Sequence, residues 1–245
     1  MHTPIFGLKK LLTLLMLVFF IGQVYAQRRT PWNLRRWDDR NYHFGFTIGF
    51  NSSNFNVDLK ENAFADQSDS LIAINNLREP GFNLGIVTSL TIHPQLRLRF
   101  IPSLSFQDRT LQYRYQATEI QNQLVEKRVE STLVSFPLLL KYRTKRINNM
   151  AAYVIGGFKY GIDMASQKDV DNAKADEIVV KLNKYNYAAE IGGGFDFFLL
   201  YFKFGIELKT DFGLPDMLIQ DNSRFSSPLE QLKTRTVFFS LTFEG

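Results

Sequence analysis

The stretch YFKFGIELKTDF at residues 201–212 decides the fold class, because apolar and charged side chains alternate along it. Successive side chains of a β-strand point to opposite faces of the sheet. One face would carry the apolar residues Phe202, Phe204, Ile206, Leu208 and Phe212, and the other would carry Lys203, Gly205, Glu207, Lys209 and Asp211. The stretch is therefore predicted to be a strand with an apolar face and a charged face.

Residues 185–198 repeat this pattern and are predicted to form a hairpin with the first stretch. One parity holds aromatic and branched residues, whereas the other holds small, polar and acidic ones. A two-residue turn at residues 199–200 would fix the register. It would place four pairs opposite each other: Asp196 with Lys203, Glu190 with Lys209, Phe195 with Phe204, and Ile191 with Leu208. Opposite charges then meet on one face and apolar side chains on the other.

Six further segments show a strand pattern, at residues 42–51, 81–92, 96–106, 128–142, 151–163 and 233–244. Gly156 and Gly157 leave the phase of the fifth strand open. The connections between the eight strands alternate between long and short, and strands of about ten residues match a tilted membrane span. The predicted fold is all-β: an eight-stranded antiparallel transmembrane β-barrel with short periplasmic turns and long extracellular loops.

A secreted lipocalin-like barrel or β-sandwich is the structural alternative. Such a protein would present its polar face to water. Here the larger and more aromatic parity is the apolar one, and the opposite parity carries charges of both signs. This arrangement favours an outer surface in contact with lipid.

The N-terminal part is predicted to form two segments before a barrel at residues 42–245. Residues 1–26 have the basic start, apolar run and small-residue end of a signal peptide. The apolar run is shorter than the roughly 20 residues of a membrane anchor. Residues 27–41 form a basic periplasmic lead-in, for which two interpretations remain: a mobile terminus with interfacial tryptophans, or a docking segment for an acidic partner. The docking candidates are Arg28, Arg29, Trp32, Arg35, Arg36 and Trp37.

The interior of the predicted barrel is rich in charge. Eight strands enclose a space that side chains fill, and buried charge is costly unless it is paired. A salt-bridged interior with a structural role, rather than an open pore, is therefore expected. Its predicted members are Arg97, Arg99, Lys141, Glu190, Asp196, Lys203, Glu207, Lys209 and Asp211.

The chemical inventory predicts a protein that is not an enzyme. The chain has no cysteine, which excludes disulfides and thiolate sites. A formal charge of +5 is too small to indicate nucleic acid. His43 and His93, near the same end of their strands, lack the further ligands that a metal site needs, and no catalytic triad can be read from the spacing. No catalytic residue, cofactor, metal or small-molecule substrate is predicted.

Seven sequence blocks, spread in order over the chain after residue 41, resemble the PorT family. They are YHFGF at 42–46, PGFNLGIV at 80–87, LRFIPSLSF at 98–106, VEST at 129–132, FPLLLKY at 136–142, YFKF at 201–204 and LKTR at 232–235. One departure is the end of the chain, where Phe243 is followed by Glu244 and Gly245 instead of a terminal aromatic residue.

The resemblance implies an outer-membrane barrel required for type IX protein secretion, which exports proteases, adhesins and gliding-motility proteins. It implies binding and scaffolding, with outer-membrane lipid and other type IX secretion components as partners, and it supplies no catalytic residues. The alternative is a general structural or adhesion barrel of the outer membrane with no part in secretion.

Overall fold

Nine β-strands follow one another along the chain. They are β1 (Tyr42–Leu59), β2 (Leu71–His93), β3 (Leu96–Phe100), β4 (Ser103–Thr118), β5 (Gln121–Arg143), β6 (Met150–Asp163), β7 (Tyr185–Phe198), β8 (Lys203–Gly213) and β9 (Leu229–Glu244). The structure is a computed structural model that describes residues 32–61, 63–64, 71–118, 121–166, 168, 178–221 and 223–245. The predicted signal peptide lies outside the described residues.

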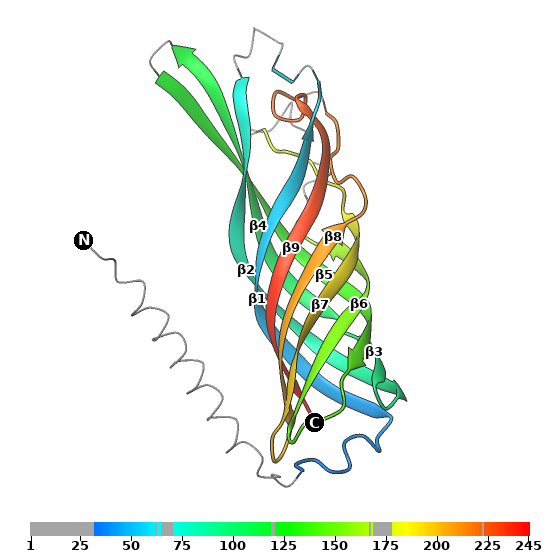
Figure 1. The fold of residues 1–245 in the computed structure, drawn as a ribbon. Helices are drawn as coiled ribbons and strands as arrows, with labels where there is room; N and C mark the ends of the chain where they lie inside the picture. The colour runs from blue at the N-terminus through cyan, green and yellow to red at the C-terminus, as the bar shows by residue number, and fades with distance from the viewer. Residues whose placement is uncertain are drawn as a thin grey trace, which may run out of the picture. The chain divides into compact units, whose positions relative to one another are not determined.

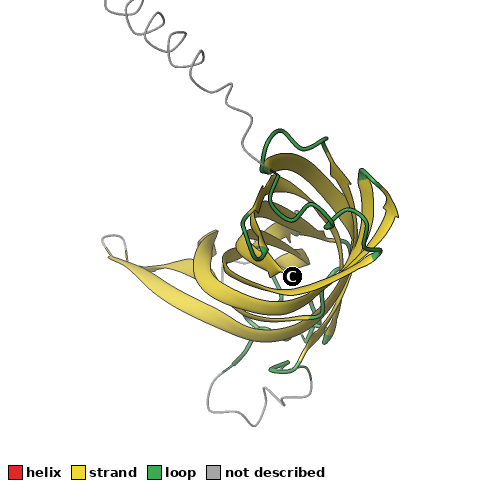
Figure 2. Ribbon diagram, turned by 90° about the horizontal axis from the view of Figure 1, so that it is seen from below, coloured by secondary structure: helices red, strands yellow, loops and turns green. Residues whose placement is uncertain are grey.

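The strands form one antiparallel sheet that closes on itself (Figures 1 and 2). β1 pairs with β2 on one side and with β9 on the other, so the first and last strands meet. β3 and β4 both pair with β2 and β5, because Ile101 and Pro102 interrupt a single strand path. The nine strands therefore occupy eight positions, and the predicted eight-stranded antiparallel barrel is confirmed.

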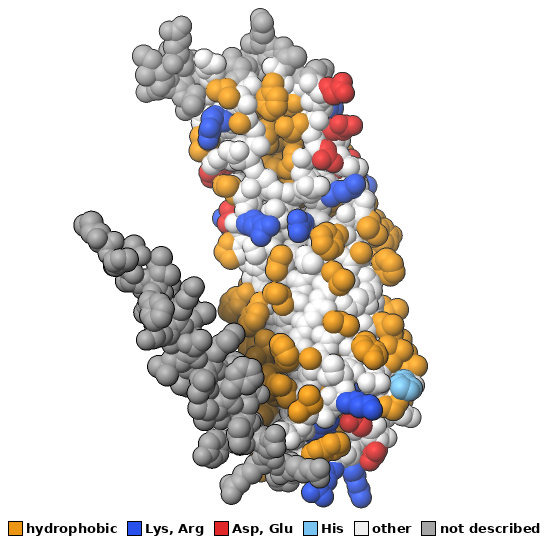
Figure 3. All heavy atoms as spheres, in the orientation of Figure 1, with side chains coloured by type: hydrophobic (Ala, Val, Ile, Leu, Met, Phe, Trp, Pro, Cys, Tyr) orange, Lys and Arg blue, Asp and Glu red, His pale blue; other side chains and the backbone are white. Residues whose placement is uncertain are grey.

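The outer surface of the barrel wall is apolar, as the alternation predicts. On β1, every second side chain from Tyr42 to Phe50 is 40% to 73% exposed, and these five residues are aromatic or branched. The other strands contribute similar residues, including Ile86, Leu138, Val154, Phe158, Ile191, Phe195 and Leu208. On the face seen in Figure 3, orange side chains cover much of the lower two thirds. A surface of this kind is suited to lipid.

The alternation reverses toward the extracellular end. On β1, the outward residue Phe50 is apolar and the inward residue Asn51 is polar, whereas farther along Asn54 and Asn56 are less buried than the inward Phe55. The inward parity of β4 changes in the same way, from Ser105, Gln107 and Arg109 to Leu111, Tyr113 and Tyr115. This reversal indicates that the strands leave the lipid and continue into water, where an apolar interior is favourable.

The long connections predicted between the strands at 42–51 and 81–92, and between those at 96–106 and 128–142, are therefore largely wrong, because strands occupy most of these residues. β1 continues to Leu59, β2 begins at Leu71, and β4 and β5 extend to Thr118 and from Gln121. Above the apolar band the side chains still alternate between two faces, but the apolar ones now face inward and the polar ones outward. The short turns at the periplasmic end, after β2, β5 and β7, are confirmed.

The predicted register of the β7–β8 hairpin is wrong by two residues. The turn holds four residues, from Leu199 to Phe202, and the Leu199 backbone N–H donates to the Phe202 carbonyl at 3.0 Å. Asp196 pairs with Gly205, Phe195 with Ile206, Ile191 with Thr210, and Glu190 with Asp211. Because the shift is an even number, every side chain keeps its predicted face.

An apolar core fills the extracellular end of the barrel. In this core, inward side chains of the long strands pack against the two segments that contain Leu182 and Leu218. An isolated β-bridge between Leu182 and Leu218 joins these two segments. The Tyr113 hydroxyl donates to the Phe225 carbonyl at 2.8 Å. The core consists of Phe55, Leu111, Tyr113, Tyr115, Val180, Leu182, Met217, Leu218, Phe225, Leu229 and Leu232.

Candidate functional site

The structure places all nine predicted interior charges inside the barrel. Eight of them are at most 4% exposed, and the Lys209 side chain is 10% exposed. Strand alternation explains this placement, because each lies on the parity opposite the lipid-facing side chains. Apart from Arg97, which pairs with Asp38 of the lead-in, they form ion pairs in two tiers along the barrel.

The lower tier lies toward the periplasmic end and is centred on Asp196 and Glu244. Lys203 is 2.7 Å from a Glu244 carboxylate oxygen and 3.8 Å from Asp196. Lys141 is 2.8 Å from Asp196. Arg99 reaches across from β3 and is 3.4 Å from Glu244. Each carboxylate therefore contacts two cations from different strands.

The upper tier is centred on Glu207. Its carboxylate is 2.7 Å from Arg99 and 3.3 Å from Lys209, and it also accepts a 2.9 Å hydrogen bond from the Tyr153 hydroxyl. Lys209 is 2.7 Å from Glu190. The Glu190–Lys209 pair that the sequence predicted as directly opposite residues thus forms along a diagonal, within reach of a long side chain.

The two tiers balance their charge. Five cations, Arg99, Lys141, Lys159, Lys203 and Lys209, face five anions, Glu190, Asp196, Glu207, Asp211 and Glu244. The cavity beside Lys159, Glu190 and Lys209 has a volume of about 20 Å³, which suffices for a single water molecule. Paired side chains thus fill this part of the interior.

Sequence reasoning missed several interior charges. Lys159, which pairs with Asp211, was not predicted as an interior charge, because two glycines leave open which residues of β6 face inward. In the structure the odd-numbered residues of that strand face inward. Arg109 lay in a predicted loop, and it donates to Ser131 and Gln107. Glu244 shares the inward parity of Thr242 and was detectable from that alternation. The side chain after Phe243 is thus an interior residue, and Phe243 itself stacks on Phe46.

The lead-in segment closes the periplasmic mouth. Trp37 is 4% exposed and stacks on the buried His43 with ring centroids 4.0 Å apart. Asp38 is 2.7 Å from Arg97 and 2.9 Å from Arg143, two arginines that are almost fully buried. One carboxylate from the lead-in therefore serves two cations of the barrel wall.

Asn33 attaches this segment to two periplasmic turns. The Asn33 backbone N–H donates to Asn149 Oδ1 at 2.8 Å, and its side chain donates to the Phe198 carbonyl at 2.9 Å. Arg146 donates to the Asn33 carbonyl at 2.6 Å and lies over the Phe198 ring. Partial burial lowers the pKa of the Arg146 guanidinium from its ordinary value, although an arginine remains a cation at neutral pH.

The six predicted docking residues do not share one environment. Trp37 is buried in the mouth, so it offers no surface to a partner in this structure, and Asn33 and Asp38 contact residues of the barrel. Arg35 and Arg36 are exposed, and Trp32 is 54% exposed. Arg28 and Arg29 lie outside the described residues.

The two histidines of strands β1 and β2 do not meet. His43 is buried inside the mouth, whereas His93 is exposed at the end of β2. Within the described ranges, no group of three or more His, Cys, Asp or Glu residues is placed to hold a metal ion. In the same part of the chain, no helix is long and apolar enough to cross a membrane.

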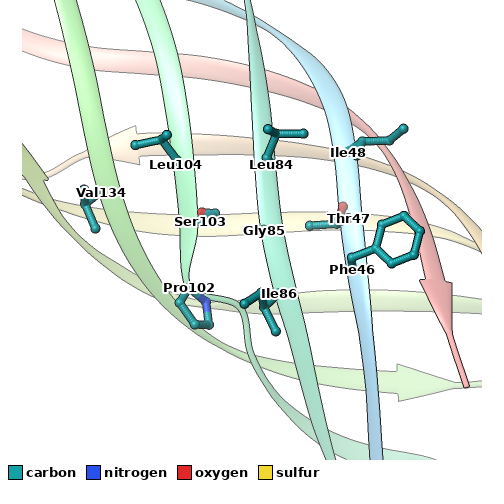
Figure 4. Close-up of a pocket in the computed structure, with 10 residues that line it drawn as sticks. All are labelled: Phe46, Thr47, Ile48, Leu84, Gly85, Ile86, Pro102, Ser103, Leu104 and Val134. Atoms are coloured by element: carbon teal, nitrogen blue, oxygen red, sulfur yellow. The ribbon is translucent and has the colours of Figure 1, made fainter.

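A shallow groove of about 360 Å³ lies on the wall where Pro102 interrupts the strand (Figure 4). Its lining is almost entirely apolar, and Phe46, Ile48, Ile86 and Leu104 belong to the lipid-facing parity. A ligand site usually adds several convergent polar groups to such a lining. The groove is a depression in the lipid-facing surface.

Several solved structures are similar to this chain. A search among curated proteins finds no match. Similar solved structures include the outer membrane protein OprG from Pseudomonas aeruginosa, with a TM-score of 0.42 and 12% identity over 84% of this chain and 95% of that chain. Another is Ail, the attachment invasion locus protein of Yersinia pestis, in complex with the heparin analogue sucrose octasulfate. It has a TM-score of 0.40 and 14% identity over 84% of this chain and 100% of that chain. The N-terminal barrel of Pseudomonas aeruginosa OprF has a TM-score of 0.31 and 12% identity over 79% of this chain and 96% of that chain.

The family comparison covers most of the chain. The model of the outer membrane protein beta-barrel domain matches residues 25–218. The protein is accordingly located in the outer membrane, and it belongs to the outer membrane protein beta-barrel domain family.

Proposed function

We propose that this barrel is a non-enzymatic component of the type IX secretion system that acts by binding and scaffolding. The proposal depends most on the seven sequence blocks that resemble PorT, which fall on β1, β2, β3, β4, β5, β8 and β9 or their flanking turns. These blocks include both lipid-facing and interior residues, so they extend beyond the general glycine-aromatic pattern of small barrels.

The filled interior supports a scaffolding role. Two tiers of ion pairs occupy the lumen, an apolar core fills the extracellular end, and Trp37 and Asp38 close the periplasmic mouth. A folded cargo protein cannot pass through such a barrel, and eight strands enclose only enough space for side chains. The contribution to export would therefore be made by the outer surfaces.

The test is a deletion strain, fractionated for type IX cargo and complemented with the intact gene. Cargo trapped in the periplasm of the deletion strain and released on complementation would support the secretion role. Normal export combined with envelope or adhesion defects would reject it, and would favour the general structural or adhesion barrel as the alternative function. A strain producing Asp38→Asn at normal abundance would report whether the closed mouth matters for export.

The absence of enzymatic activity is also part of the proposal. The charges of the two tiers are paired with one another, and this balance offers a structural reason for their presence. A hydrolytic or transfer activity that is abolished by one interior or loop substitution, with folding unchanged, would contradict it.

A further inference from the structure

We propose that the periplasmic end of this barrel carries a docking surface for an acidic, partly apolar segment of a periplasmic protein. The surface combines the exposed cations Arg35, Arg36 and Lys145 with the apolar turn residues Leu200 and Tyr201. It differs from the docking segment expected from the sequence, because Trp37 is excluded and two turns of the barrel are included.

Hydrogen bonds join the three segments that carry this surface. Asn33 contacts both Asn149, in the turn between β5 and β6, and Phe198, at the end of β7. Arg146 bonds to the Asn33 carbonyl and covers the Phe198 ring. Lys145 precedes Arg146, and Leu200 and Tyr201 follow Phe198 by two and three residues. The cations and the apolar turn therefore lie around a common junction.

The exposed charge of this end is mainly positive. In the described lead-in and in the turn after β5, Arg35, Arg36, Arg40 and Lys145 are exposed, whereas Asp39 is the one exposed acid. Asp38 is engaged by two buried arginines and adds no free negative charge. A surface of this composition attracts an acidic partner and disfavours a basic one.

The apolar component is unusually exposed for a turn. Leu200 is 70% and Tyr201 is 87% exposed, and Ile147 in the neighbouring turn is 72% exposed. Apolar and aromatic side chains surrounded by charge are typical of binding surfaces, where the apolar residues supply most of the energy and the rim sets specificity.

The path of the lead-in favours a protein over lipid as the occupant. The segment contacts Asn149 and Phe198 through Asn33, and Arg97 and Arg143 through Asp38, and Trp37 between these contacts packs against the edge of Phe198. Arg35 and Arg36 lie between these two anchored residues, at the mouth that faces the aqueous periplasm, and both are exposed. Positive charge in that position is available to a soluble segment.

The experiment is site-specific photo-crosslinking in intact cells, with p-benzoylphenylalanine in place of Tyr201. The variant Arg35→Glu/Arg36→Glu reverses the charge of the patch. The variant Lys168→Glu/Lys184→Glu is the matched control, because both lysines are exposed in the connection between β6 and β7 at the opposite end. Heat-modifiable mobility on gels verifies that each variant is folded.

The expected result is a discrete protein adduct whose crosslinked peptide is acidic. Its yield should fall at least several-fold in Arg35→Glu/Arg36→Glu and should be unchanged in the control. An adduct with lipid alone, a peptide without acidic residues, no adduct at all, or a yield that ignores the charge reversal would each overturn the proposal. Normal cargo export in the deletion strain, with the charge-dependent adduct intact, would reject the secretion role and leave this surface in place.

Discussion

Asp38 shows how a side chain from outside the barrel wall supplies a carboxylate to two cations of the wall. The two tiers of the interior are balanced without Asp38. Arg97 and Arg143, at the mouth, lie outside these tiers, and Asp38 is the carboxylate that they share. Both guanidinium groups contact the same oxygen, Asp38 Oδ1. The lead-in is therefore held by electrostatics as well as by the stacking of Trp37 on His43.

Asp38→Asn is expected to loosen the mouth. Removing one partner of a buried ion pair costs 3–5 kcal/mol when both are buried; Asp38 is 31% exposed, so a loss of roughly 2 kcal/mol is expected. In a Trp32→Phe background, acrylamide should quench Trp37 fluorescence more strongly in Asp38→Asn than in the parent. Asp39→Asn, next to it and exposed, is the control. Equal quenching in all three proteins would show that Asp38 does not hold the segment.

Glu207→Gln is expected to destabilise the folded barrel by about 3 kcal/mol, because it leaves the buried Arg99 and Lys209 with one shared anion fewer. Leu208→Ala is the control. Its side chain is 59% exposed and faces lipid, so the substitution should cost less. Urea unfolding of both variants in lipid vesicles measures the difference. A Glu207→Gln barrel as stable as the parent would mean that the network is not stabilised by this carboxylate.

At the residue scale, the sequence predicted where charges point and not which partner each one finds. Alternation alone places Glu207 and Lys209 on the interior parity. The contact of Arg99 with Glu207 spans the lumen and joins β3 to β8, so it depends on closure of the barrel. Asp38 lies before the first strand, in a segment without alternating apolar and polar residues, so the sequence pattern does not predict its contacts.

At the scale of elements, glycines allow the β6–β7–β8 region to pack closely around the ion pairs. A Cβ atom on Gly194 would lie 2.1 Å from the Ile206 carbonyl oxygen and 2.7 Å from the Tyr153 hydroxyl. The same hydroxyl donates to Glu207. The glycine therefore gives room to a residue of the upper tier.

Gly194→Ala is expected to reduce the folded fraction, with a cost of about 1–3 kcal/mol for overpacking. Gly156→Ala is the matched control, since a Cβ there would come no closer than 3.8 Å to another atom. Refolding into detergent micelles, followed by heat-modifiable gel mobility, measures the folded fraction of each. Equal refolding of the two variants would contradict the close packing seen here.

The extent of the strands shows what sequence patterns can and cannot supply at this scale. The apolar parts of β1, β2, β4 and β5 were predicted because one parity faces lipid. Their extracellular parts were assigned to loops because Phe55 and Leu111 lie on the parity that is polar lower down. Only the change of surroundings from lipid to water explains the exchange. The hairpin register failed because the turn, Leu199 to Phe202, lacks the residues that identify a two-residue turn.

At the scale of the whole molecule, three kinds of contact between the described residues occupy the interior of the barrel and close it. The periplasmic mouth is closed by Trp37 and Asp38, the middle by ion pairs, and the extracellular end by an apolar core. The sequence predicted the membrane barrel and its charged interior. Both closures depend on segments without strand periodicity, which a single sequence does not place.

The most direct test of the sealed barrel is the ionic current through the purified full-length protein in a planar lipid bilayer. The filled lumen predicts insertion, verified by heat-modifiable gel mobility of the same sample, without stepwise ohmic current. Reproducible conductance steps from the unmodified protein would contradict a closed interior and would restore a conduit role to the lumen.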